Sequence, residues 1–180
     1  MRSPSHPPSC TCRQHPLPAG MRVRDALQVY LDENGFTAAA YDAARTTGSL
    51  LGLKLSVPNP PSHRRAIRLH DLHHVATGFG TDHAGEGELS AWQIRRGLRR
   101  AGAYAAAIVA LNTTVGLMVA SRRTWAAFKQ AGSGGSLFDR DVDYDVVLDR
   151  SVGELRALLA VPERGLADVR RGLHAHAPAS

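Results

Sequence analysis

Residues 62–86 read SHRRAIRLHDLHHVATGFGTDHAGE and join two expected helices through a glycine-rich turn. Ser62 is a typical N-cap, and the spacing of the apolar residues after it predicts a helix that ends near Gly78. The turn over residues 78–85 then allows the chain to reverse before the next helix begins. We therefore expect the second half of one helix to lie beside the start of the next.

This stretch contains the pattern H-D-x-x-H-x11-E, formed by His70, Asp71, His74 and Glu86. His70 and His74 are four positions apart and share one helical face, with Asp71 at the edge of that face. Two imidazoles and two carboxylates are suitable ligands for a divalent metal. The spacing predicts a metal site, with zinc favoured over iron or manganese. The alternative is that these side chains lie on exposed helix faces and hold nothing.

The same four residues are the candidate catalytic residues, because a metal with open coordination positions polarises a substrate oxygen or activates water. Asp71 is either a ligand itself or a residue that orients His74 and a bound water. His73 points roughly 100° away around the helix, so we expect it on the surface or behind the ligands. His83 is an alternative to Glu86 as a ligand, and Glu88 is expected to be solvated.

The rest of the chain predicts an all-α fold, a single-domain bundle of six to seven helices over residues 21–162. A proline-rich leader (residues 1–20) is expected to be disordered and a tail (163–180) weakly ordered. Three prolines make residues 57–61 extended or turning. Residues 141–149 are compatible with a short helix or a strand. The remaining expected helices cover residues 23–34, 37–48, 85–100, 104–120, 123–131 and 151–161, the last opened by a capping box at Ser151 and Glu154.

The charge of the chain is +6 and its pI is about 10.0, which is compatible with binding to nucleic acid or an anionic membrane. Only Lys54 and Lys129 are lysines, however, and we interpret the excess arginine as a solvated surface rather than a nucleic-acid site. Arg95, Arg96, Arg99 and Arg100 are placed outward at the end of their helix, where cations interact well with the helix dipole.

Cysteine usage and hydropathy bear on the cellular compartment of the protein. The two cysteines, Cys10 and Cys12, lie in the leader and fit a reducing compartment. No apolar secretory signal is visible in the first 20 residues. Residues 104–120 are the most apolar stretch, and we expect a core helix there, with a lipid-facing helix as the alternative. We predict a cytoplasmic location. The alternative is a peripheral location on the inner face of the cytoplasmic membrane.

The residues of the H-D-x-x-H-x11-E pattern, in the context LHDLHHVATG, resemble the hallmark of the coenzyme Q (ubiquinone) biosynthesis proteins of the Coq-four type. Two further segments resemble the family more weakly: Pro58-Asn59-Pro60 and VGELRALL over residues 152–159. The resemblance covers roughly residues 23–161, but only the motif is specific. The chain is short, its part after Gly132 is loop-rich, and its leader is unlike a mitochondrial transit peptide, so a bacterial source is favoured.

The resemblance implies an all-helical fold with a metal bound by His70, Asp71, His74 and Glu86. It also implies an apolar groove for a prenyl tail and oxidative removal of the C1 carboxyl group from a prenylated ring precursor. The implied partners are that quinone precursor or another isoprenoid lipid, other quinone-biosynthesis enzymes and, as a homodimer, a second copy of the chain. Two further hypotheses are a helical binding module with a structural metal and an HD-type phosphohydrolase.

Overall fold

The computed structural model describes residues 17–50 and 53–167, so most of the predicted leader and tail fall outside it. The fold is all-α as predicted, with one two-stranded antiparallel hairpin among the described residues. Its elements are α1 (Val23–Asn34), η1 (Ala38–Asp42), β1 (Arg45–Leu50), β2 (Leu53–Pro58), α2 (Pro61–Thr77), α3 (His83–Arg96), α4 (Ala103–Gln130), η2 (Leu137–Asp139), α5 (Tyr144–Leu148) and α6 (Val152–Leu158).

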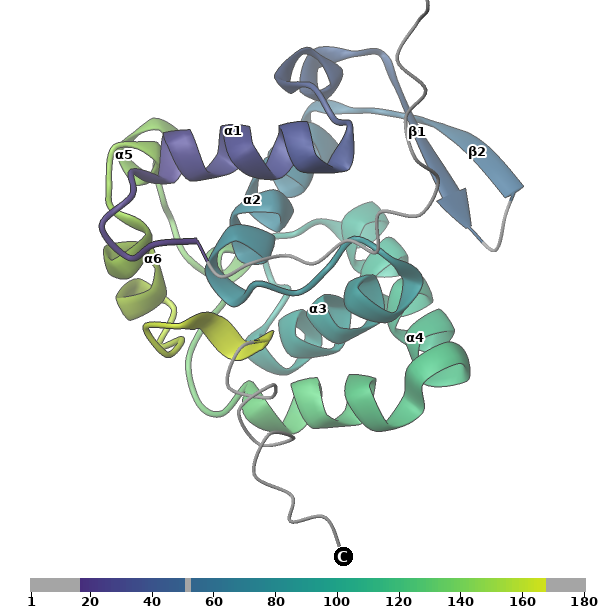
Figure 1. Cartoon of the computed structure of the whole chain (residues 1–180). Coiled ribbons are helices and arrows are strands. Elements are labelled where there is room, and N and C mark those ends of the chain that lie inside the picture. Colours follow the sequence, from purple (N-terminus) through teal and green to yellow (C-terminus); the bar gives the residue numbers. More distant parts are fainter. Residues whose placement is uncertain (1–16, 51–52, 168–180) are drawn as a thin grey trace, which may run out of the picture.

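Helix α2 occupies the middle of the molecule (Figure 1), where it contacts α1, α3, α4, α6, η1 and η2. Its apolar residues Leu69, Leu72, Val75 and Ala76 are all buried in the main hydrophobic core. The helix begins two residues earlier than expected, with Pro61 in its first turn and Pro60, not Ser62, as the N-cap. Proline suits this position because its φ is already helical and its missing N–H would have had no partner there.

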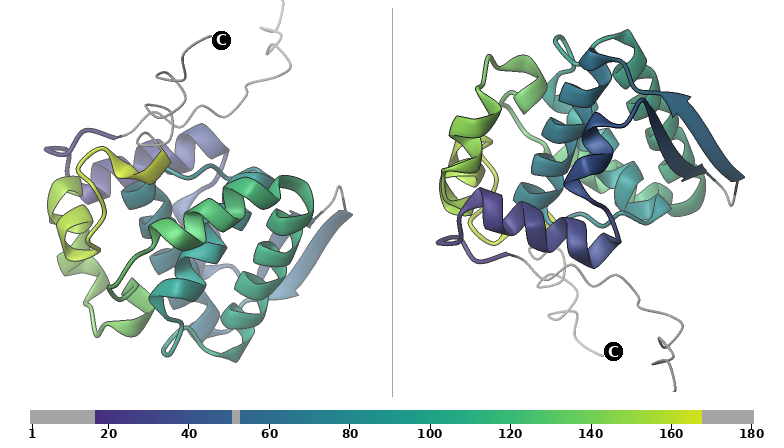
Figure 2. Two further views of the ribbon diagram at one scale, coloured as in Figure 1. Left: turned by 90° about the horizontal axis from the view of Figure 1, so that it is seen from below. Right: turned by 90° about the horizontal axis from the view of Figure 1, so that it is seen from above.

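The helix predicted over residues 37–48 is wrong beyond its first turn. Ala38–Asp42 forms a short 3-10 helix, and the chain then enters strand β1, whose Gly48 is paired with Leu55 of β2. Thr46, Thr47 and Gly48 explain the change, because threonine and glycine are poor helix formers and β-branched residues favour strands. Both views in Figure 2 show the hairpin on the side of the molecule opposite α5 and α6.

The two helices predicted over residues 104–120 and 123–131 are the two arms of α4. They meet at a kink at Ala120, whose φ of −151° and ψ of 51° are not helical. Figure 2 shows the bend between the arms. Helix α3 is shorter than predicted and ends at Arg96, because Gly97 has a φ of 107° that helical residues cannot adopt. Arg96 is consequently buried and donates to the carbonyl of Leu159 at 2.7 Å, not exposed as expected.

The expectation of a core helix at residues 104–120 is wrong for the outer face of α4. Ala105, Val109 and Val115 are buried, but the most apolar 18-residue window of the helix is only 22% buried. Besides Tyr104 near its start, the exposed large apolar side chains on α4 are Leu111, Leu117, Met118, Val119 and Trp125, and we call these five the outer α4 face. By length and composition α4 is able to span a membrane, although the arm before the kink is shorter than the roughly 20 residues a span requires.

Two glycines let α3 and α4 approach each other backbone to backbone. A Cβ atom on Gly87 would overlap the Cα atom of Gly116, and a Cβ on Gly116 would overlap the Cα of Gly87. Both glycines are buried within their helices, where glycine has the lowest propensity apart from proline. The close approach therefore explains residues that helix formation alone disfavours, and it fixes α4 beside the first turn of α3.

Candidate metal centre

His70 and His74 of α2 and Glu86 of α3 converge on one point. The Nε2 atoms of the two histidines are 3.1 Å apart. Glu86 places Oε2 at 3.3 Å from Nε2 of His70 and Oε1 at 3.2 Å from Nε2 of His74. The ligand atoms of the three residues all lie within 4.8 Å of one another, so this group could hold a metal ion.

The turn between α2 and α3 brings Glu86 to the histidines. Helix α2 ends at Thr77, and Asp82 caps α3 by accepting the backbone N–H of Gly85 at 2.8 Å. Glu86 therefore lies in the first turn of α3, where the helix dipole favours a negative charge. The cap and the turn hold the carboxylate against the last two turns of α2.

The hydrogen bonding of His74 prepares its Nε2 atom to bind a cation. Its Nδ1 atom lies 2.9 Å from the carbonyl oxygen of Phe79, which accepts only, so Nδ1 carries the proton. In the neutral ring Nε2 then has a free lone pair, directed at His70 and Glu86. Around a tetrahedral zinc with bonds of about 2.0–2.1 Å, donor atoms lie roughly 3.4 Å apart. The observed separations of 3.1–3.3 Å and the donor set therefore suit a divalent ion.

The charges within the group are mutually dependent. Burial alone would raise the pKa of Glu86, but His74 and His70 outweigh it and hold the pKa of that carboxyl well below its ordinary value. Burial alone would lower the pKa of His70, but the charge of Glu86 and its hydrogen bond raise it above 6.5. Without a metal, Glu86 therefore favours the protonated form of His70, and a divalent cation competes with that proton for the same place.

Asp71 is not brought into the group with the other three motif residues. Its Oδ1 atom accepts a hydrogen bond from Tyr30 at 3.3 Å and its Oδ2 atom one from Tyr41 at 2.5 Å. Burial raises the pKa of Asp71, against the opposing effects of His70 and the Tyr41 hydrogen bond. Tyr30 also stacks on His74 with ring centroids 5.3 Å apart. Asp71 therefore holds Tyr30, and Tyr30 in turn packs on His74. This arrangement is compatible with the expected alternative in which Asp71 helps to orient His74.

His73 occupies the buried one of its two expected positions, whereas Glu88 is buried against expectation. His73 is fully buried against Trp92 and Phe138, so its surface alternative is excluded, and burial lowers its pKa well below 6.5. Glu88 is 2% exposed and forms a bidentate pair with Arg123 at 3.0 and 2.9 Å, which contradicts the expectation of a solvated residue. His83 begins α3 but does not belong to the metal group.

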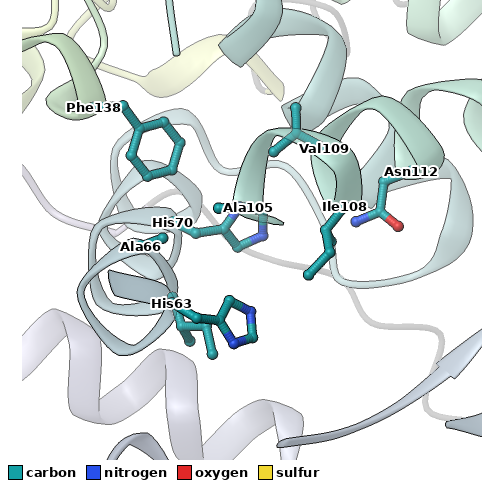
Figure 3. Close-up of a pocket in the computed structure, with 9 residues that line it drawn as sticks. His63, Ala66, His70, Ala105, Ile108, Val109, Asn112 and Phe138 are labelled. Carbon is teal, nitrogen blue, oxygen red and sulfur yellow. The ribbon is translucent and has the colours of Figure 1, made fainter. Parts of the chain in front are cut away.

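A pocket of about 80 Å³ lies between α2 and α4 and is bordered by His70 (Figure 3). Most of its walls are apolar, and Asn112 places Nδ2 3.5 Å from Glu86 Oε2. His63, one wall of the pocket, is 5% exposed and its Nδ1 atom has no hydrogen-bond partner. The lining residues are His63, Ala66, Ile67, His70, Ala105, Ile108, Val109, Asn112 and Phe138.

Sequence reasoning missed Tyr30, Tyr41 and Gln93 as neighbours of the group. Each contacts a motif residue from another element, and nothing in the local pattern around it marks that contact. Comparisons of the chain with protein-family models, curated proteins and solved structures found no match. The fold and the site therefore define an all-α protein with a candidate His-His-Glu metal group beside an apolar pocket.

Proposed function

We propose that this chain is a metal-dependent protein of ubiquinone biosynthesis that acts on, or presents to other enzymes, a prenylated ring precursor. Its C1 carboxyl leaves as CO₂ and its ring carbon is oxidised by an external two-electron oxidant such as O₂, since zinc itself has no redox chemistry. The observation that carries the proposal is the His70, His74 and Glu86 group at the wall of an apolar pocket. The resemblance of the motif to the Coq-four type of proteins supports the quinone precursor as the ligand. Zinc is the favoured metal, with iron or manganese as alternatives.

The residues of the chain supply binding and orientation. Three protein ligands leave a divalent metal open to an oxygen atom of the substrate, and the metal when bound supplies Lewis-acid chemistry to a ring carboxylate or phenolate. Phe138 and Val109 contribute apolar walls, on which the ring would pack with little water. Asn112, close to Glu86, is placed to hydrogen-bond a polar ring substituent.

The prenyl tail requires more space than the pocket provides. Pockets for drug-sized ligands measure about 300–1,000 Å³, whereas this one measures about 80 Å³. The ring end of the precursor would therefore occupy the pocket, and its tail would follow the outer α4 face. The same exposed face suits peripheral contact with the cytoplasmic membrane, in which an isoprenoid precursor resides.

A structural metal is the second candidate function, because the three ligands come from two helices and His74 is completely buried. A metal at this position would tie α2 to α3 whether or not the chain turns over a substrate. The HD-type phosphohydrolase is less well supported, since that class would use Asp71 as a ligand and this carboxylate contacts Tyr30 and Tyr41 instead.

Metal analysis and lipid mass spectrometry of the purified full chain test the proposal. We expect about one equivalent of metal and a co-purifying prenylated lipid in the parent, loss of metal in His70→Ala, and retention of both in the matched control His83→Ala. A deletion strain should accumulate the ring-carboxylated precursor. A parent without metal contradicts the metal site, and unchanged quinone levels in the deletion strain contradict the pathway.

A further inference from the structure

Gln93 of α3 lies between two histidine rings of α2, in an interior position that the proposed chemistry does not use. The amide atom assigned as Nε2 is 3.1 Å from Nδ1 of His70 and 2.9 Å from Nδ1 of His73, while the atom assigned as Oε1 has no hydrogen-bond partner. On the far side of His73, Nε2 lies 2.9 Å from the backbone nitrogen of Leu137. His73, Gln93 and Leu137 are each 0% exposed, so water cannot replace these contacts.

The backbone of Leu137 determines where the proton of His73 lies. A backbone N–H only donates, so Nε2 of His73 must accept with its lone pair. A neutral imidazole carries one proton, which is then on Nδ1. Nδ1 of His73 is therefore a donor, and the group that faces it must be an acceptor.

This requirement fixes the orientation of the Gln93 amide. The two ends of a primary amide have nearly the same shape, and the hydrogen-bond network decides which is oxygen. If the NH₂ group faced the rings, His73 would receive two donors and carry no proton at all. We propose that Oε1 of Gln93 lies between the rings and accepts two hydrogen bonds, one from Nδ1 of His73 and one from Nδ1 of His70.

The consequence for His70 rests on the proposed metal site. With one proton of His70 held on Nδ1 by Gln93, Nε2 is the atom that loses its proton when a cation binds, and its lone pair then faces Glu86 and His74. The carbonyl of Phe79 has the same effect on His74. The chain from the Leu137 backbone through His73 and Gln93 thus selects the metal-binding tautomer of His70. Gln93 and His73 are positioning residues, since neither touches the metal position.

The spacing on α3 supports this arrangement. Glu86 and Gln93 are seven residues apart, so they lie on one face of the helix two turns from each other. The first supplies a carboxylate to both ligand histidines, and the second fixes the proton of one of them. Helix α3 therefore holds the ligand face of α2 at two points, and residues 136–138 reach the same network through Leu137.

The tautomer of His73 is measurable in the full chain by ¹⁵N NMR of histidine-labelled protein, with or without metal. We expect the Nδ1 resonance of His73 in the range of protonated nitrogens and Nε2 in the range of nitrogens with a lone pair. A neutral His73 with its proton on Nε2 would overturn the proposal, because Nδ1 would then carry the lone pair and the Gln93 amide would have to present its NH₂ group to it.

Zinc affinity measured by competition with a chromophoric chelator tests the link to His70. Gln93→Leu is expected to bind zinc about 10- to 100-fold more weakly than the parent, the usual cost of losing a hydrogen bond behind a ligand. Gln93→Glu keeps an acceptor for both N–H groups and is expected to bind at least as tightly as the parent. Ser90→Ala, which removes another buried polar group of α3, is the control and should bind like the parent.

The outcomes separate this proposal from the proposed function. A parent that binds zinc while Gln93→Leu binds equally well overturns the role of Gln93 alone. A parent that binds no metal overturns the metal site and the role of Gln93 with it. Weaker binding by Gln93→Leu together with restored affinity in Gln93→Glu supports the role, because a general loss of packing would weaken both variants.

Discussion

Most proteins have an apolar interior and a polar surface. The interface between α2 and α3 departs from this pattern by being polar inside, and the outer α4 face departs from it by being apolar outside. The first encloses His74 and Gln93 completely and His70 and Glu86 in part among polar partners, whereas the second leaves Leu117, Met118 and Val119 exposed to solvent. Buried polar groups are costly unless they are paired, and large exposed apolar patches mark contact surfaces. Each region departs from what stability alone favours, and each therefore points to a ligand.

The two regions also differ in how many other elements of the fold they contact. The polar interface is connected to many elements, through Tyr30 and Tyr41 to α1 and η1 and through His73 to η2. The outer α4 face has no such connection among the described residues. Changes at the interface should therefore affect folding and binding together, and changes on the outer face should affect binding alone.

The largest effect is expected from His74→Ala. This variant removes a fully buried candidate ligand that also stacks on Tyr30, and truncating a large, fully buried side chain to alanine typically costs about 2–5 kcal/mol. We expect a loss of stability in that range and loss of measurable zinc binding, checked by urea unfolding and metal analysis. His83→Ala should change neither quantity, and a stable His74→Ala that still holds metal would contradict the site.

A smaller but clear effect is expected from Gly116→Ala at the α3–α4 contact. The added Cβ would overlap the backbone of Gly87 and approach the hydroxyl of Thr124, and overpacking of this kind costs about 1–3 kcal/mol. The free energy of unfolding should fall by that amount. Gly20→Ala, where a Cβ would meet nothing within 4 Å, should be neutral within about 0.5 kcal/mol.

Raising the pH should destabilise the metal-free protein through His70. The folded-state pKa of His70 lies above its ordinary value of 6.5, so its contribution to stability is complete below pH 6.5 and is lost as the pH rises through the folded pKa. Zinc should reverse the trend, since it binds the deprotonated ring and binds more tightly at higher pH. Urea unfolding with chelator or with zinc measures both slopes, and in His70→Gln the chelator slope should be shallower.

The smallest effect on stability is expected from Met118→Ser. Met118 is 75% exposed, so the free energy of unfolding should change by less than about 0.5 kcal/mol. Binding to anionic lipid vesicles, measured by sedimentation, should nevertheless weaken. Val115→Ser, a buried position on the same helix, should do the reverse and lower stability by about 1–3 kcal/mol. Equal vesicle binding by Met118→Ser and the parent would remove the outer α4 face as a lipid contact.

The candidate ligands were predictable where local spacing determines position. His70 and His74 share a face because they are four apart in one helix, and the glycine-rich turn places Glu86 near them. The partners of Asp71 were not predictable, because Tyr30 and Tyr41 reach it only through the packing of α1 and η1 on α2. Gln93 was missed for the same reason, since its role appears only once two helices are placed side by side.

The same distinction holds for the fold. The capping box at Ser151 and Glu154 was predicted and is present, because it involves neighbours three residues apart. Strand β1 was read as helix because its pairing with β2 depends on residues up to 13 positions away, as in the pair Arg45 and Pro58. The outer α4 face was read as core because apolar composition does not reveal whether anything covers a helix.

The contact between Gly87 and Gly116 has a mechanical consequence. Side chains between helices can adjust by changing rotamers, but here the two backbones are in direct contact and no side chain lies between them. We therefore expect a displacement of α4 at Gly116 to move Gly87 of α3 with it. Glu86, the residue before Gly87, carries the carboxylate that faces both histidines. A partner that binds α4 would therefore be expected to change the position of Glu86 relative to His70 and His74.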